Sequence, residues 1–266
     1  MSFPSIIEGN PGDQRKTSLS PLDGNPLGTI LRIGECEFTH ARIGGTAMVA
    51  GRLYQSASAH VGVADTMLNK GLIPAAVYAV GATTVAFTIG GTTAITTNLL
   101  KDGYLYTASS TGGGIGYAYK IKSNNSAAAG STTCTVVLYE SDGLQAATEA
   151  ATTRFGISVH PFNACELTMA NTVGSNVAGV SCATAAASSY VWLQRKGPAA
   201  VYTGGTVLLQ RSPSVCSTAV AGAIVPIAVA ATTALLNTKE GFQVIGIGMN
   251  AAEITGFSMV DLCILP

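Results

Sequence analysis

The sequence predicts an all-β protein. Short segments rich in Val, Ile, Thr and Tyr recur along the chain, turns that contain glycine separate them, and few stretches show the period of an amphipathic helix. Short strands at spacings of about 8–12 residues are typical of β-sandwiches and β-barrels. We therefore expect sandwich-like or barrel-like domains, preceded by an extended N-terminal arm.

Residues 1–28 are the expected arm. Prolines and glycines alternate there with no period of a strand or helix: Pro4, Gly9, Pro11, Gly12, Pro21, Gly24, Pro26 and Gly28. Proline fixes φ and glycine interrupts regular structure, so the segment is expected to be extended. Two interpretations stay open for the segment: a disordered tail, or an arm that lies on a neighbouring subunit, which the apolar pair Ile6 and Ile7 would suit.

The expected strands follow from residue 29 onward. They are 29–33, 36–41, 52–55, 84–89, 103–106, 116–121, 133–139, 156–160, 177–181, 190–194, 199–202, 206–210, 223–227, 242–248 and 256–265. Turn sequences such as Asp102–Gly103 stand between several of them. Two short helices are expected, at 64–70 and 146–152.

The order of these segments indicates one domain inserted into another. The main β domain is expected to contain residues 29–75 and 153–266, and the inserted β domain residues 76–152. Two links rich in Ser, Ala and Asn, at 122–132 and 170–188, suit surface loops.

The charge content excludes some classes of function. Among 266 residues there are 14 Lys and Arg and 14 Asp and Glu, so the net charge is zero and charged residues make up only 11%. A neutral chain lacks the positive surface that phosphate backbones require, so no nucleic-acid partner is expected. Because solitary soluble proteins cover their surface with charged side chains, we expect much of this surface to be covered by partner subunits.

No targeting or membrane segment is expected. The N-terminus lacks a basic region followed by an apolar stretch. The charge-free stretch 212–238 is long enough to span a bilayer, but it contains Pro213, Pro226 and many Ser and Thr residues. We interpret it as two buried strands and a loop.

Neither a metal nor another cofactor is expected. The six cysteines, at 36, 134, 165, 182, 216 and 263, lack the close spacing of zinc ligands and are interpreted as reduced thiols, most of them buried. The three histidines, at 40, 60 and 160, form no cluster in the sequence.

Two motifs resemble functional ones without their context. Residues 179–183, Gly-Val-Ser-Cys-Ala, lack the last glycine of a nucleophile elbow, and no α/β sheet is expected around Ser181. Residues 112–116, Gly-Gly-Gly-Ile-Gly, precede an alternating strand and not a helix, so a hairpin or bulge is expected and not a phosphate loop. No catalytic residues are assigned, and the protein is expected not to be an enzyme.

Several segments together resemble structural proteins of tailed bacteriophages. They are Phe-Thr-His-Ala-Arg-Ile-Gly-Gly within 38–54, Gly-Tyr-Leu-Tyr and Gly-Gly-Gly-Ile-Gly-Tyr-Ala-Tyr within 103–123, Tyr-Val-Trp-Leu-Gln-Arg-Lys-Gly-Pro within 178–202, and the glycine-rich continuation to the C-terminus. The resemblance covers most of residues 30–265. It implies a small β domain that sits on a capsid lattice.

The resemblance and the composition together predict a capsid decoration, or cement, protein. Its partners would be the major capsid protein and further copies of itself, as a homotrimer on the outer surface of the virion, made in the host cytoplasm. Trp192 is expected in the core. The expected interface residues are apolar, aromatic or basic: Ile6, Ile7, Arg15, Lys16, Tyr117, Tyr119, Tyr190 and Arg195.

Two other functions fit the sequence. One is a tail, fibre or minor head protein. The other is a carbohydrate-binding, host-recognition module that stacks sugars on aromatic rings from two neighbouring strands, Tyr104, Tyr106, Tyr117 and Tyr119.

Overall fold

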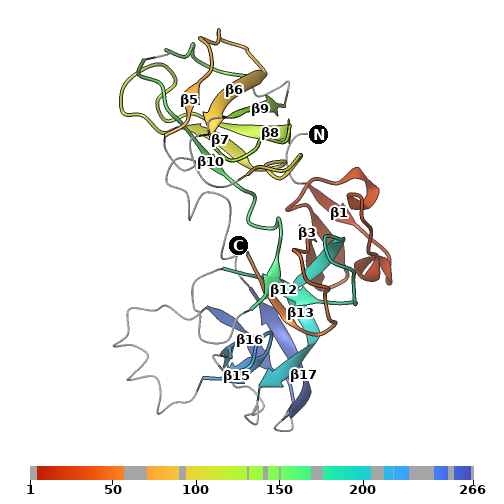
Figure 1. Cartoon of the computed structure of the whole chain (residues 1–266). Coiled ribbons are helices and arrows are strands. Elements are labelled where there is room, and N and C mark those ends of the chain that lie inside the picture. The colour runs from red at the N-terminus through yellow and green to blue at the C-terminus, as the bar shows by residue number, and fades with distance from the viewer. Residues whose placement is uncertain are drawn as a thin grey trace. The chain divides into compact units, whose positions relative to one another are not determined.

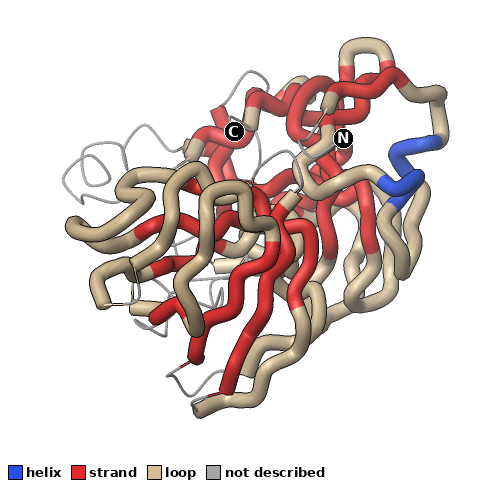
Figure 2. The backbone as a smooth tube through the Cα atoms, turned by 90° about the horizontal axis from the view of Figure 1, so that it is seen from above, coloured by secondary structure: helices blue, strands red, loops and turns tan. Residues whose placement is uncertain are grey.

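Strands form nearly all the regular structure of the chain in a computed structural model (Figure 1). The structure describes residues 5–56, 71–89, 94–130, 132–139, 143–149, 151–168, 176–204, 213–217, 219–227, 243–250 and 255–264. Within these ranges the helical backbone is confined to two 3-10 turns, η1 (Asp13–Arg15) and η2 (Leu22–Gly24), seen in blue in Figure 2. The predicted all-β fold class is confirmed.

The two predicted helices have different outcomes. Residues 64–70 lie outside the described residues. The described residues of 146–152 form no helix, so that prediction was wrong. Thr153 accounts for part of the difference, because its hydroxyl accepts a hydrogen bond from the Glu149 amide at 2.9 Å and so competes with helical bonding.

The chain divides into two units. The smaller unit contains residues 59–160, and the larger contains residues 3–58 and 161–266. These limits differ from the expected 76–152 because strands β5 (Ile73–Pro74) and β10 (Phe155–Ser158) both belong to the sheet of the smaller unit.

The smaller unit is a closed six-stranded barrel. Its other strands are β6 (Thr84–Ile89), β7 (Tyr104–Thr107), β8 (Ala118–Asn124) and β9 (Thr132–Leu138). The strands pair antiparallel in the order β10-β7-β8-β9-β6-β5. Leu72, next to β5, exchanges two backbone hydrogen bonds with Phe155 of β10, at 3.0 and 2.9 Å, and these bonds close the ring.

Alternating side chains fill the barrel. In β6 the side chains of Val85, Phe87 and Ile89 are buried, while those of Thr84 and Thr88 are exposed. Because successive side chains of a strand point to opposite faces, the apolar set points inward and closes the interior of a barrel of this size. The unit is therefore held by a packed core and not by an open channel.

The larger unit contains an eleven-stranded sheet that curls on itself. Its strands are β1 (Ile6–Glu8), β2 (Ile30–Ile33), β3 (Cys36–Arg42), β4 (Leu53–Gln55), β11 (Glu166–Leu167), β12 (Val177–Ser181), β13 (Tyr190–Gly204), β14 (Pro213–Cys216), β15 (Ile224–Pro226), β16 (Val244–Gly248) and β17 (Thr255–Cys263). The main order is β1-β2-β3-β13-β15-β14-β16-β17, and β17 pairs back onto β13. This last pairing closes a ring of five strands around an apolar core.

Strand β13 connects the two parts of this sheet. The sequence predicts two strands, 190–194 and 199–202, but the structure has one strand that passes through Gly197, whose φ is 83°. Up to Lys196 the strand pairs with β3, and from Lys196 to Gly204 it pairs with β17. Continuous pairing keeps the strand intact across the Gly–Pro sequence.

Most other predicted strands are present with small shifts at their ends, and 84–89 and 177–181 have the predicted bounds. The predicted strand 206–210 lies outside the described residues. The charge-free stretch 212–238 supplies β14 and β15 in its described part. In the described ranges, no helix has the length and apolar character that a membrane crossing requires.

Residues 5–28 pack against other parts of the same chain. Strand β1 pairs parallel with β2, and Ser18 bridges to Tyr190 of β13. The side chains of Leu22 and Leu27 are buried, and Leu22 packs with Trp192. The described part of the segment thus covers part of the core of the larger unit, where the sequence left open a disordered tail or an arm on a neighbouring subunit.

Candidate interaction surface

The outer face of β16 and β17 exposes an unusual group of large apolar side chains. Ile247 and Phe257 are 51% and 57% exposed, and Met249 and Met259 are also exposed. We call these four residues the apolar stripe. Their strands alternate, so Ile245, Val260 and Leu262 point into the core while the stripe faces outward. Such a group differs from the single exposed apolar residues that any protein surface carries.

The strand register makes the stripe continuous. The Met249 amide donates to the Met259 carbonyl at 2.9 Å, which joins the two strands at the end of β16. On the other edge of β17, Phe257 lies opposite Tyr202 and Met259 lies opposite Ala200, both on β13. The exposed face thus runs across three neighbouring strands.

An aromatic pair and an arginine border the stripe. The rings of Tyr202 and Phe257 meet edge to face with centroids 5.5 Å apart. The guanidinium of Arg52 lies 3.5 Å from the centroid of the Tyr202 ring and donates to the Ala221 carbonyl at 3.2 Å. A side chain at Gly51, whose φ is 69°, would overlap the Phe257 ring, so glycine at this position makes room for the ring.

Charge is scarce on this face. In the sequences of β16 and β17, Asp261 is the single charged residue, and it lies opposite Ile247 on the outer face. Aromatic residues and Met are enriched, and charged residues depleted, in the buried centre of protein interfaces. The composition of the face therefore matches an interface centre better than an ordinary solvated surface.

The predicted interface residues near the N-terminus have different environments. Ile6 is exposed on β1, whereas Ile7 packs beside the cluster that contains Trp192. Lys16 pairs with the Asp13 carboxylate at 2.9 Å. The hydrogen bond from the Asn10 amide, and after it this contact with Lys16, lower the pKa of Asp13, and the same contact raises the pKa of Lys16. Arg15 lies at the edge of a pocket described below.

Tyr190 and Arg195 on β13 contact their own chain. The Tyr190 ring stacks on His40 with centroids 5.5 Å apart, and Arg42 lies 5.9 Å from the same ring. The Arg195 guanidinium lies 5.4 Å from the Phe162 ring centroid. Trp192 is buried, which confirms its expected place in the core.

The aromatic platform that the sequence suggested does not exist as a set. Tyr119 is only 1% exposed and fills the barrel, so its prediction as an interface or sugar-stacking residue was wrong. Tyr117 is exposed just before β8, with its ring centroid 6.3 Å from that of Tyr119. On the outer side of the barrel, the buried Lys120 places its Nζ 4.6 Å from the centroid of the Tyr104 ring.

The two motifs of possible chemistry have structural roles. The Ser181 hydroxyl is buried, lies within hydrogen-bond distance of the Val49 and Arg52 carbonyls, and accepts from the Arg52 amide at 3.0 Å. Those contacts join β12 to the turn before β4. The glycine run at 112–116 forms a turn that leads into β8, with positive φ at Gly112, Gly114 and Gly116.

Four of the six thiols have strongly raised pKa values. Burial raises the pKa of Cys165 and Cys182 to about 12 and that of Cys134 and Cys216 to about 11. These side chains are therefore neutral at pH 7 and act as small apolar groups. In the described part of the chain, no three His, Cys, Asp or Glu side chains come together in an arrangement that could hold a metal ion.

A two-sided apolar pattern was the sequence signal for the stripe. In Val244-Ile-Gly-Ile-Gly-Met249 no residue is polar, so neither face of the strand is marked as the solvated one. The sequence analysis predicted both segments as strands without assigning a solvated face to either, and so missed the exposed face. Comparison with protein-family models, with curated proteins and with solved structures finds no match to this chain.

Proposed function

We propose that the chain is a non-enzymatic structural subunit of a tailed-bacteriophage particle, a decoration or cement protein that binds the outside of the head. Its resemblance to phage structural proteins, set out above, supplies the class of particle. The exposed apolar stripe carries the proposal, because a group of exposed apolar side chains is a typical surface for protein contact. The low charge of the whole chain points in the same direction.

The stripe supports contact with protein and not with nucleic acid. Phe257, Met249 and Met259 are residue types that are enriched at the centre of protein interfaces. The zero net charge offers no general attraction for a phosphate backbone. We propose that copies of this chain pack through the stripe as a homotrimer, and that the trimer contacts several subunits of the major capsid protein.

A symmetric oligomer suits such a task. When several copies engage a lattice at once, the effective concentration of each further contact is high, and the overall affinity exceeds that of one contact by orders of magnitude. Each single contact then needs only modest area. This argument connects the low charge, the exposed stripe and the repeated surface of a capsid.

Electron microscopy of particles from the phage that encodes the chain tests this function. The expected result is density for the chain on the outer surface of the head, at junctions between capsid subunits, and heads without the chain that release their genome at a lower temperature. Location on the tail, or absence from the particle, would overturn the proposal. If the chain fully occupies its sites on the head but the stability of the head is unchanged without it, the chain decorates the head and does not cement it.

A further inference from the structure

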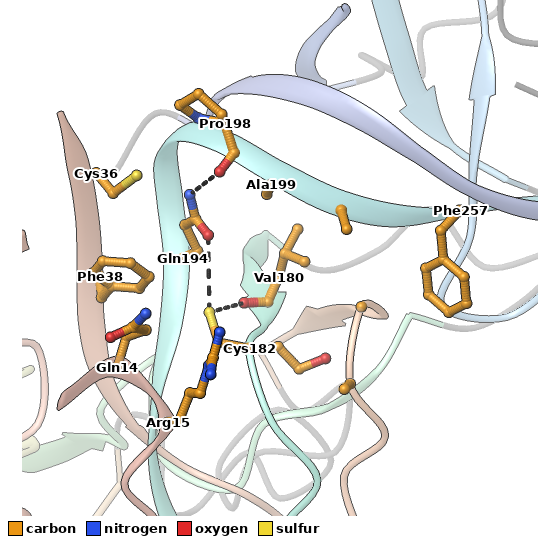
Figure 3. Close-up of a pocket in the computed structure, with 14 residues that line it drawn as sticks. Gln14, Arg15, Cys36, Phe38, Val180, Cys182, Gln194, Pro198, Ala199 and Phe257 are labelled. Carbon is orange, nitrogen blue, oxygen red and sulfur yellow. Dashed lines mark hydrogen bonds between the residues drawn. The ribbon is translucent and has the colours of Figure 1, made fainter. Parts of the chain in front are cut away.

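A pocket of about 410 Å³ opens in the larger unit, and Phe257 of the apolar stripe is one of its lining residues (Figure 3). It lies between η1, β3, β12 and β13, and its apolar walls are formed by Phe38, Val180, Pro198, Ala199 and Phe257. This volume is within the range of about 300–1,000 Å³ that is usual for small-molecule sites.

Most polar groups of the pocket are already used within the chain. Gln194 donates from Nε2 to the carbonyls of Lys196, Gly197 and Pro198, at 3.2, 3.3 and 2.9 Å. Its Oε1 accepts a weak hydrogen bond from Cys182 Sγ at 3.8 Å. Ser181 is used between β12 and the turn before β4, as described above. These groups shape the wall and have little capacity left for a ligand.

Arg15 is the exception. It projects from η1 toward Cys182 in Figure 3. The nearest acid along the chain, Asp13, is occupied by Lys16 at 2.9 Å and by the Asn10 amide at 2.8 Å. In the part of the chain that the structure describes, Arg15 has no carboxylate within ion-pair distance. Cys182 stays neutral at pH 7 because burial raises its pKa to about 12. The guanidinium is therefore the charge that a bound molecule meets.

We propose that this pocket binds a small monocarboxylic acid with an apolar, ring-sized body. The carboxylate pairs with the guanidinium of Arg15, which can bind it through two parallel hydrogen bonds. The body contacts the apolar lining of the pocket, which includes Phe38, Val180 and Phe257. This inference does not depend on the proposed structural function, and each can fail without the other.

Isothermal titration with 3-phenylpropionate, and with its uncharged amide as the matched probe, tests the assignment on the full chain. The acid is expected to bind at millimolar concentration or below, and about tenfold or more tighter than the amide, because a hydrogen-bonded charge is lost in the amide. Backbone amide resonances of Cys182, Gln194 and Ala199 are expected to shift with the acid. No binding of the acid, or equal binding of acid and amide, would overturn the proposal.

Two pairs of variants assign the binding to this pocket. Arg15→Gln is expected to weaken binding of the acid about tenfold, whereas Lys122→Gln, which removes the same charge from an exposed position in the smaller unit, leaves it unchanged. Phe257→Ser is expected to weaken the binding of both the acid and the amide. Met259→Ser, on the same face of β17 but outside the pocket, is expected to leave the binding of both unchanged. Amide spectra of each variant confirm that it is folded.

These experiments distinguish a small carboxylic acid from a partner protein as the molecule that the pocket binds. Equal affinity of wild type and Arg15→Gln for the acid would show that the guanidinium does not hold the carboxylate, and would overturn the proposal. If 3-phenylpropionate leaves the Cys182 and Gln194 resonances unchanged and an acidic peptide shifts them, the proposal of a small-acid site is wrong. The pocket would then bind an acidic side chain of a partner protein.

Discussion

His40 and Trp192 lie opposite each other on β3 and β13, with ring centroids 5.1 Å apart. The two nitrogens of His40 meet the N-terminal segment. Nε2 accepts from the Leu22 amide at 3.4 Å, and Nδ1 lies 3.1 Å from the Pro26 carbonyl. Because Nε2 accepts, the proton of the neutral ring is on Nδ1, which donates to Pro26. One imidazole thus joins the segment 5–28 to the core of the larger unit.

Replacing His40 tests this connection. His40→Phe keeps a ring beside Trp192 but leaves the Leu22 amide and the Pro26 carbonyl without this partner. We expect the free energy of unfolding to fall by about 1–3 kcal/mol, the usual cost of buried polar groups that lose their partner. Urea denaturation followed by the fluorescence of Trp192, the single tryptophan, measures it. Lys16→Gln, on the exposed side of η1, is the control and should leave the midpoint unchanged. An unchanged midpoint for His40→Phe would contradict the assigned bonds.

Removing residues 2–28 should destabilise the larger unit. Leu22 and Leu27 are buried, and burial of each leucine side chain contributes about 1.5–3 kcal/mol. We therefore expect a loss of about 3–6 kcal/mol from these two side chains alone. The emission of Trp192 should shift to the red, because Leu22 is part of its cover. A truncated chain with the emission and midpoint of the full chain would show that the segment is only an appendage.

The N-terminal segment shows why some features escaped sequence reasoning. Its prolines and glycines correctly exclude long strands and helices, but they say nothing about which surface the segment lies on. The decisive contacts are long-range: Leu22 meets a histidine 18 residues later, and Ser18 bridges to Tyr190. By contrast, alternation within 84–89 gave the bounds and the inward face of β6 directly.

The apolar stripe predicts a change in association. Met259→Glu places a charge at the centre of the stripe without disturbing the core, because Met259 points outward. We expect the proposed oligomer to be lost in this variant, since a carboxylate buried without a partner in an interface is costly. Light scattering coupled to size-exclusion chromatography measures the mass. Val77→Glu, an exposed apolar position in the smaller unit, is the matched control and should retain the wild-type mass.

The wild-type association should also depend little on salt. The four residues of the stripe are uncharged and Asp261 is the single charged residue of β16 and β17, so screening has little to weaken. The mass measured at low and at high sodium chloride should agree. A wild-type chain that is monomeric at every concentration, or an oligomer that Met259→Glu leaves intact, would show that the stripe does not mediate self-association. The stripe would then be proposed only as a contact to the capsid.

Interface and core strands read alike in this sequence, and that limited the prediction of the site. Phe257 and Met259 alternate with Ser258 and Val260, so the larger apolar residues would by themselves be assigned to the inside. The structure reverses this assignment, because the smaller side chains fit inside a ring of five strands. Tyr119 shows the opposite error, since an aromatic residue assigned to a surface fills the wider six-stranded barrel.

The buried thiols predict a loss of stability in alkaline solution. Burial raises the pKa of Cys165 to about 12 and that of Cys134 to about 11, whereas an unfolded thiol titrates near pH 9. Above about pH 9 the unfolded chain loses protons that the folded chain retains, so the free energy of unfolding falls as pH rises toward these folded pKa values, and is independent of these groups below about pH 8. Urea midpoints from about pH 7 to about pH 10.5 measure the slope. Cys165→Ala should have a shallower alkaline fall than wild type, since one raised pKa is gone. Val136→Ala, at a buried position with no titrating group, should keep the wild-type slope. Equal slopes for wild type and Cys165→Ala would show that the Cys165 thiol is not shielded from water as the structure places it.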